Sequence, residues 1–328
     1  MLPPEWVRAL SVVQWMWTFL FLGPSAVLLM VALLCSRLWL LAVLYYGWWL
    51  WDWHGPERGP RHNRWVRNWK MWEHFCDYFP ITVVRTAPLP PHRSYLLAAH
   101  PHGIACIGIF GAFVSGGRGA WGGRGGSGGP CPGLKPTLAV LGGLFRLPLY
   151  REYAMAAGLC PVSRPCLQRV LSQPGQALLI VVGGAAEALD PGDPECPRVT
   201  LKGRFGFVRM ALRYGTPLVP VFVFGELQAL PHISFPEGSR LRRLQRALKA
   251  LLGFAPCVWR GRGGLPLLPH AVPLTVVVGA PLEVPRLPRP PPSAVRRLHG
   301  RYVRELRRLV RRHAPGAGLP EGGNLSVI

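Results

Sequence analysis

The chain has 328 residues, a formal net charge of +23 and an isoelectric point near 11.0. A charge this positive favours a polyanionic partner, such as nucleic acid, an anionic lipid surface or a phosphorylated substrate. The 13 tryptophans and the mean hydropathy of +0.21 favour lipid over nucleic acid. The eight cysteines include no C-x-x-C pair, which argues against a disulfide scaffold or a zinc site, so we expect reduced thiols and no metal.

The N-terminal stretch is the most apolar part of the chain, with Arg37 as the only charged residue between positions 11 and 51. Residues 11–36 are long enough to cross a bilayer, which takes ~20 apolar residues, and Gly23-Pro24 should kink them. Residues 38–51 are shorter, which fits a tilted half-span or a re-entrant arm. Arginines and tryptophans follow, as at a cytosolic membrane interface. We predict a membrane hairpin over residues 1–53 with both ends cytosolic; a buried helical pair in a soluble core is the less favoured alternative.

We predict that residues 54–328 form one α/β domain. Apolar, strand-like runs at residues 177–182, 218–224 and 274–278 alternate with helical or irregular segments, which predicts a mostly parallel sheet with flanking helices. Residues 239–252 and 293–313 are basic and amphipathic. Such helices either cover the sheet or lie on an anionic membrane surface, and the sequence leaves both alternatives open.

A short stretch near residue 100 has the form of a catalytic site. The apolar run of residues 95–99 predicts a strand buried on both faces, which Pro101 must end. His100 and His102 therefore lie at the carboxyl end of a strand, where open α/β sheets bind their ligands. Histidine is the side chain best suited to accept a proton near neutral pH, and Gly103 allows a turn or a close backbone approach.

The segment at residues 115–130 is mostly glycine, and we expect it to be a mobile loop. It contains formal matches to the G-x-S-x-G elbow and to a dinucleotide-binding fingerprint, but neither has the strand–turn–helix context that those motifs need. Its Arg-Gly pattern raises RNA binding as a hypothesis of another class. The tryptophan-rich hairpin argues against it, so we predict no nucleic-acid partner.

Several segments together resemble the diacylglycerol acyltransferase 2 family, which includes monoacylglycerol and wax-alcohol acyltransferases. The tetrad His100-Pro101-His102-Gly103 resembles its signature. Further blocks that resemble the family follow in collinear order across most of the chain, at residues 78–80, 147–164, 182–189, 206–226 and 278–282. The resemblance implies a glycerolipid-acyltransferase-like α/β fold behind the hairpin.

The resemblance also implies a function. A membrane-bound O-acyltransferase would move a fatty acyl group from acyl-CoA to the hydroxyl of mono- or diacylglycerol, in triacylglycerol synthesis, with acyl-CoA as co-substrate and no bound cofactor. A histidine of the signature would be the base, and the sequence does not decide between His100 and His102. Glu187 would face the same cleft or, alternatively, be a carboxylate favoured by a helix N-terminus. The expected substrate-binding residues are Pro101, Gly103, Gly183, Gly184, Lys202 and Arg204, with the last two facing coenzyme A phosphates or forming a solvated basic loop.

Some features of the sequence depart from the family pattern. Related enzymes place an aspartate five positions after the catalytic histidine, where this chain has Ala105 and Ile107. Phe205 stands where lysine is usual, and Leu227 where asparagine is usual. A catalytically weak or inactive family member is therefore an alternative. The resemblance to the family also leaves a wax-alcohol acyltransferase as an alternative.

The resemblance implies a location in the endoplasmic reticulum membrane, with lipid droplets as a further location and the catalytic domain in the cytosol. It leaves self-association open.

Residues 235–240 resemble the phosphate-binding motif of the glycerol-phosphate acyltransferases. In those enzymes the motif precedes a Val-Pro-Val strand, whereas here it follows that strand. We interpret Glu237 as part of a surface turn and helix cap.

Overall fold

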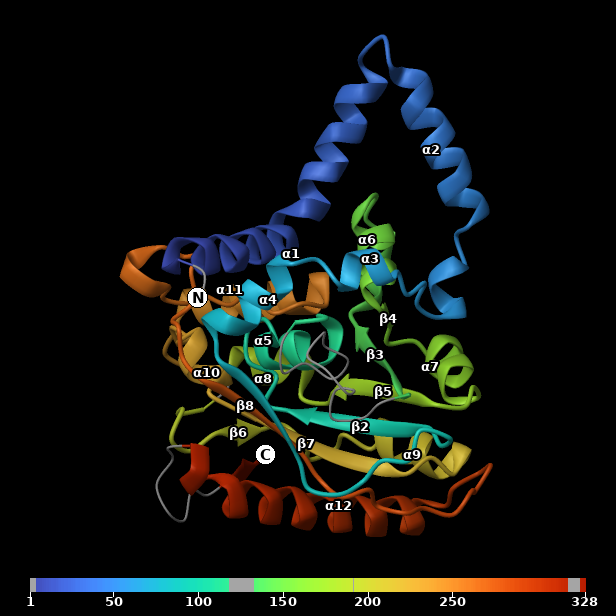
Figure 1. Ribbon diagram of the computed structural model, residues 1–328, viewed down its shortest axis with the longest axis vertical. Coiled ribbons are helices and arrows are strands. Elements are labelled where there is room, and N and C mark those ends of the chain that lie inside the picture. The colour runs from blue at the N-terminus through green and yellow to red at the C-terminus, as the bar shows by residue number, and fades with distance from the viewer. Residues whose placement is uncertain (1–3, 118–132, 191, 318–324) are drawn as a thin grey trace.

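The computed structural model describes residues 4–117, 133–190, 192–317 and 325–328 (Figure 1). Most of the predicted glycine-rich loop, from residue 118 onward, lies outside these ranges.

The domain is built on a seven-stranded sheet with the strand order β1-β8-β7-β2-β5-β3-β4. Its strands are β1 Ile81–Arg85, β2 Tyr95–His100, β3 Lys135–Val140, β4 Leu159–Pro161, β5 Gln176–Val181, β7 Leu218–Phe224 and β8 Leu274–Val278. Every pair is parallel except β7 with β8. The prediction of a mostly parallel sheet is therefore confirmed, and the three apolar runs are β5, β7 and β8. A separate parallel pair joins β6 Arg198–Val199 to β9 Ser326–Val327 at the C-terminus.

Helices cover both faces of the sheet (Figure 1). The longer helices of the chain, including α2 in the projecting segment, are α1 Glu5–Leu34, α2 Trp39–Trp51, α4 Met71–Tyr78, α6 Tyr150–Ala157, α7 Arg164–Leu171, α8 Gly184–Leu189, α9 Gly206–Tyr214, α11 Arg240–Leu252 and α12 Pro292–His313. Short helical pieces are η1 Gly55–Arg58, α3 Arg64–Arg67, α5 Ile107–Ile109, η2 Phe110–Val114, η3 Gly142–Arg146, α10 Glu226–Ala229, η4 Arg262–Gly264 and η5 Pro315–Ala317.

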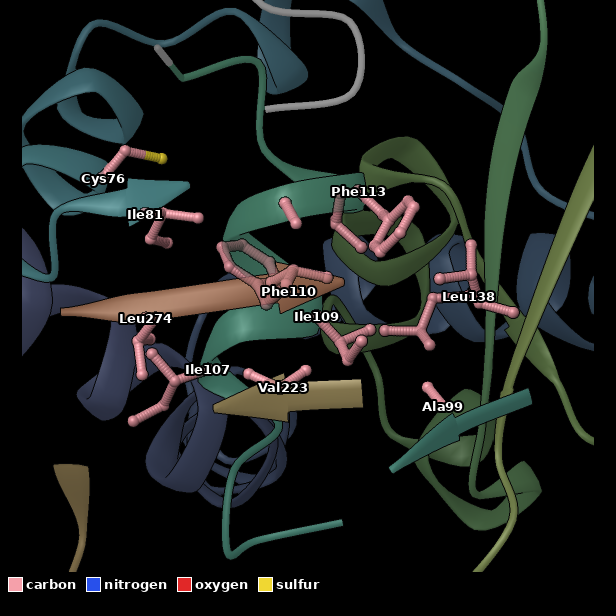
Figure 2. Close-up of a cluster of buried hydrophobic side chains, with 14 of the residues drawn as sticks. Cys76, Ile81, Ala99, Ile107, Ile109, Phe110, Phe113, Leu138, Val223 and Leu274 are labelled. Carbon is pink, nitrogen blue, oxygen red and sulfur yellow. The ribbon is translucent and has the colours of Figure 1, made fainter. Parts of the chain in front are cut away.

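Strand β2 lies at the centre and is buried on both faces, as predicted. Tyr95, Leu97 and Ala99 belong to one core cluster, whereas Leu96 and Ala98 belong to the other. This alternation is the period of two that a strand imposes on its side chains. Part of the first cluster is drawn in Figure 2, where the α5–η2 segment lies over strand residues from β2, β3, β7 and β8. The segment that follows the histidine tetrad is therefore anchored in the core.

Helices α1 and α2 occupy the residues of the predicted hairpin, and its insertion into a membrane stays a prediction. Among the described residues, α1 is the one helix that is long and apolar enough to cross a membrane, by length and composition alone. It begins at Glu5, with Pro24 inside it, and Figure 1 shows it bent into a segment along the domain and a segment that projects away. Proline in a helix interior removes a hydrogen bond and clashes with the preceding turn, which accounts for the bend. Helix α2 has 13 residues and returns to the domain.

The returning end of α2 is held by a buried ionic network. The Arg151 side chain on α6 is 1% exposed and pairs with Asp52 at 3.3 Å and with Glu152 at 2.7 Å. Arg61 pairs with the same Asp52 at 2.6 Å. The guanidinium of Arg151 also lies 5.0 Å from the ring centre of Trp48 on α2. These contacts fix the base of the projecting segment to the domain.

Candidate active site

His100 ends strand β2, and its side chain continues the alternation toward α12. The ring is fully buried, and its Nε2 lies 3.0 Å from the Tyr302 hydroxyl. That hydroxyl donates to the Ala98 carbonyl oxygen at 3.0 Å. Because the Tyr302 proton is used there, His100 Nε2–H must be the donor to Tyr302, which makes the unpartnered Nδ1 the basic nitrogen. Burial lowers the pKa of His100 to about 3. The ring is neutral and enclosed within the core.

His102 lies beyond the strand end and is only half-buried. Its Nδ1 lies 3.0 Å from the Gly103 carbonyl oxygen. Since a carbonyl can only accept, Nδ1 carries the proton and donates it, and Nε2 keeps its lone pair. Burial lowers the pKa of His102, and the Gly103 carbonyl opposes that shift. At neutral pH the ring is therefore an uncharged imidazole with one nitrogen able to accept a proton.

Glu187 lies in α8, in the turn that follows β5, and is fully buried. Its carboxylate accepts the main-chain N–H of His102 and, at 2.7 Å, that of Thr200. Burial raises the pKa of Glu187 to about 7, against the lowering effect of the Thr200 and His102 N–H groups and of Arg204. Glu187 therefore holds the backbone of the histidine loop, and the His102 ring takes its orientation from Gly103.

Two of the predicted glycines make room for buried glutamate side chains, Gly183 for that of Glu187 and Gly103 for that of Glu226, which follows β7. A Cβ on Gly183 would lie 2.0 Å from Glu187 Oε2, and one on Gly103, where φ is +57°, would lie 2.7 Å from the Glu226 side chain. Gly184 has a φ of +59°, a conformation that L-residues rarely adopt, and its missing side chain would meet open space. Pro101 is buried between the two histidines.

The two basic candidates differ in their placement. Arg204 donates to the Gly183 carbonyl oxygen at 3.3 Å, which places it beside the Glu187 turn. Lys202 has an exposed side chain and donates its main-chain N–H to the carbonyl oxygen of Ile328 at 2.7 Å.

Glu226, the first residue of α10 just after β7, is a site residue that was not predicted from the sequence. It is 2% exposed and accepts the main-chain N–H groups of Ile107 at 2.7 Å and Gly108 at 2.8 Å. Burial raises its pKa to about 7. The signal was present, because Gly225-Glu226 follows an apolar strand just as the Gly-Gly turn and Glu187 do. Tyr302 was likewise not singled out, since the sequence shows it only as one residue of the amphipathic segment 293–313.

The site is thus a half-buried neutral imidazole on a loop that two buried carboxylates hold by its main chain. Within the described residues, no group of three or more histidine, cysteine, aspartate or glutamate side chains could hold a metal ion. Glu237, in the phosphate-site resemblance, is exposed and pairs with Arg246 at 2.5 Å, and Ser239 caps α11. Its interpretation as a surface turn is confirmed.

A neutral imidazole at the carboxyl end of a parallel strand can accept a proton from a substrate. The class of reaction comes from the family to which the chain belongs. The model of the diacylglycerol acyltransferase family matches residues 31–327. The chain belongs to this family, and it is an acyltransferase.

Two named relatives are similar over nearly the whole chain. Diacylglycerol O-acyltransferase 2 of Bos taurus is 41% identical over 328 residues, which cover 98% of this chain and 89% of the relative. The 2-acylglycerol O-acyltransferase 3 of Homo sapiens is 44% identical over 336 residues, covering 100% of this chain and 96% of the relative. Among solved structures, the 1-acyl-sn-glycerophosphate acyltransferase PlsC of Thermotoga maritima aligns with a TM-score of 0.41 and 11% identity, over 93% of this chain and 96% of that one.

Proposed function

We propose that this protein transfers a fatty acyl group from acyl-CoA to the hydroxyl of mono- or diacylglycerol, in triacylglycerol synthesis at the endoplasmic reticulum membrane. The names of the relatives support both acceptors, since one relative is a diacylglycerol and the other a 2-acylglycerol O-acyltransferase. The single observation that carries the chemistry is the state of His102. It is an uncharged imidazole with a free Nε2, and it lies just beyond the carboxyl end of the central strand.

His102 Nε2 is the base of the proposed reaction. It takes the proton of the acceptor hydroxyl while the hydroxyl oxygen forms a bond to the thioester carbonyl carbon. The C–S bond then breaks, and the coenzyme A sulfur leaves with the proton returned by the imidazolium. The ester and free coenzyme A are the products, without an acyl-enzyme. His100 does not take this role, because its ring is enclosed and hydrogen-bonded to Tyr302.

Glu187 and Arg204 complete the proposed site. Glu187 acts as a positioning residue, since its contacts are with the main chain of the His102 loop and of Thr200. Arg204 lies beside the same turn and is the stronger candidate for a coenzyme A phosphate, which arginine binds through charge-assisted hydrogen bonds. Lys202 is two positions before Arg204 and has an exposed side chain, so it would add a second positive charge for the phosphates.

The projecting part of α1 and α2 is the proposed membrane anchor. Its apolar side chains are unusually exposed, for example Leu28 at 70%, Leu44 at 61% and Trp51 at 84%. At 1.5 Å per residue, residues 24–34 rise roughly 16 Å and α2 roughly 20 Å. The hydrocarbon core is ~30 Å thick, so a re-entrant hairpin that enters one leaflet fits these lengths better than a pair of full spans. Both ends of the hairpin would then lie on the cytosolic side.

An acceptor panel tests the proposal. Microsomes that contain the protein are given labelled acyl-CoA with monoacylglycerol, diacylglycerol or a fatty alcohol. We expect glyceride product, and His102→Gln should lower its rate of formation by about 10²–10⁴-fold. Product only from the fatty alcohol would instead identify a wax-ester enzyme, and no product with any acceptor would indicate a silent family member.

A further inference from the structure

Helix α11 exposes its apolar side chains and buries polar ones. The side chains that it buries are polar, with Arg242 at 7% and Gln245 at 5% exposure. Leu241, Leu244 and Leu251 are 55%, 54% and 80% exposed. Their spacing of three and seven residues places them on one stripe of the helix. In water this arrangement would be unfavourable, because the leucines gain nothing from burial.

The orientation of α11 is fixed by hydrogen bonds to its polar side. Arg242 donates to the Leu189 carbonyl oxygen at 3.0 Å, and Gln245 donates to that of Pro256 at 3.0 Å. The Ser239 side chain accepts the Arg242 N–H and caps the helix. A rotation that buried the leucines would leave the Leu189 and Pro256 carbonyl groups without these partners. The outward leucines are therefore a property of the folded domain.

Helix α12 shows the opposite behaviour with a similar composition. Its apolar repeat, which includes Val295, Leu298, Tyr302 and Leu306, is buried against the sheet. The two amphipathic helices of the sequence thus differ: α12 buries its apolar residues against the sheet, whereas Leu241, Leu244 and Leu251 of α11 are each more than half exposed.

Further apolar side chains are exposed after the end of α11. Phe254 is 48% and Leu265 is 60% exposed. Arg262, between these two residues, pairs with Glu5 at the start of α1 at 2.8 Å. Near that start, Trp6 is 69% and Leu10 is 59% exposed. The segment around Arg262 therefore lies beside the start of α1, and both segments expose apolar side chains.

We propose that α11 lies in the plane of the membrane as a second contact with the bilayer, beside the hairpin, and that its basic residues bind anionic lipid headgroups. Arg240 and Arg243 are exposed next to the leucine stripe, as is usual for helices that bury an apolar face at the headgroup level. A second copy of this chain fits the surface less well, because two such basic helices would repel each other. The helix would hold the domain, and with it the site, against the surface that supplies the lipid acceptor.

The experiment measures where α11 lies relative to the lipid. Full-length protein with Cys35 and Cys196 replaced by serine is reconstituted into vesicles of phosphatidylcholine with phosphatidylserine. An environment-sensitive fluorophore is attached to Leu244→Cys, to Leu28→Cys in the hairpin, or to Arg308→Cys on the exposed side of α12; the protein without an added cysteine gives the background. Quenching by lipids that carry a nitroxide near the top of the acyl chain is then compared.

We expect the fluorophores at positions 244 and 28 to be quenched several-fold more than the one at position 308. Replacing Arg240 and Arg243 by glutamate should reduce quenching at 244 and leave that at 28 unchanged. Quenching at 28 without quenching at 244 above the level at 308 would overturn this proposal and leave the hairpin anchor standing. If neither is quenched, the anchor fails as well. Energy transfer between fluorophores at 244 on two copies, without lipid quenching, would also overturn it in favour of a dimer contact.

Discussion

The two histidines of the signature should respond differently to the same substitution. Replacing either one by glutamine keeps a polar side chain of similar size and removes the imidazole. His102→Gln removes a half-buried ring with a free nitrogen, whereas His100→Gln alters a buried ring that is bonded to Tyr302. The pair separates the loss of a base from the loss of a structural hydrogen bond.

The expected magnitudes follow from these surroundings. A general base contributes about 10²–10⁴-fold to the rate, so His102→Gln should lower kcat by that factor, or by about 3–5.5 kcal/mol of barrier, with little change in KM. His100→Gln disturbs a bond inside the core, and a buried group that loses its partner costs about 1–3 kcal/mol. The free energy of unfolding should fall by that amount, while kcat of the folded fraction stays within about tenfold of wild type.

The assay is acyl transfer by purified protein in detergent micelles that contain the acceptor, normalised to the folded fraction by thermal unfolding. Free imidazole should partly restore His102→Ala and have no effect on His100→Ala, which a merely structural role of His102 would not produce. The reasoning is refuted if His100→Gln, measured per folded molecule, loses as much kcat as His102→Gln does.

Three further predictions test the surroundings of the site. Gly183→Ala places a methyl group 2.0 Å from the Glu187 carboxylate, so kcat should fall at least as far as in Glu187→Gln, with thermal stability as the control. Burial raises the pKa values of Glu187 and Glu226 to about 7, so the folded state still binds protons that the unfolded state has lost. The stability that these two groups contribute is full below their usual pKa and should decline as the pH rises through 7. The decline in the free energy of unfolding should be smaller in Glu187→Gln. Arg151→Met leaves the buried carboxylate of Asp52 with Arg61 alone, and should lower the unfolding temperature more than Arg61→Met, since Arg61 is 47% exposed.

Much of the fold could be predicted because its strands are buried on both faces and so form continuous apolar runs. Strands β7 and β8 match the predicted runs residue for residue, and β5 differs by one residue at each end. The short edge strand β4 gave no comparable signal, since three residues do not establish a period. The order of the strands and the antiparallel pairing of β8 depend on contacts between distant segments, which local patterns do not encode.

The choice between the histidines could have been made from the strand alone. If Tyr95 and Ala99 face one side of the sheet, then His100 faces the other, together with Leu96 and Ala98. A residue still within a doubly buried strand is enclosed, and the next histidine, after Pro101, is the first that can be reached. What the sequence could not supply is the partner on that side, Tyr302, because it comes from a helix 202 positions away.

The sequence pattern did not predict which side α11 and α12 bury. Both helices carry leucines at helical spacing among arginines, and the sequence left their two roles open. The difference arises from their inner contacts. Tyr302 reaches the sheet through the Ala98 carbonyl group, whereas Arg242 binds the end of α8 through Leu189 and turns its leucines outward.

The structure holds the histidine loop without the aspartate that related enzymes place five residues after the catalytic histidine. Ile107 occupies the position five residues after His102, and its side chain is buried in the core. A carboxylate is nevertheless present, because Glu226 reaches the main-chain N–H of the same residue from the end of β7. On the other side of the loop, Glu187 binds the N–H of His102 itself. Both ends of the loop are thus held through its backbone, so the imidazole needs only the Gly103 carbonyl group to set its tautomer. It follows that Glu226→Gln, which weakens the hold on Ile107 without touching the ring, should lower kcat and leave the pKa of His102 nearly unchanged, as nuclear magnetic resonance titration of the imidazole would measure.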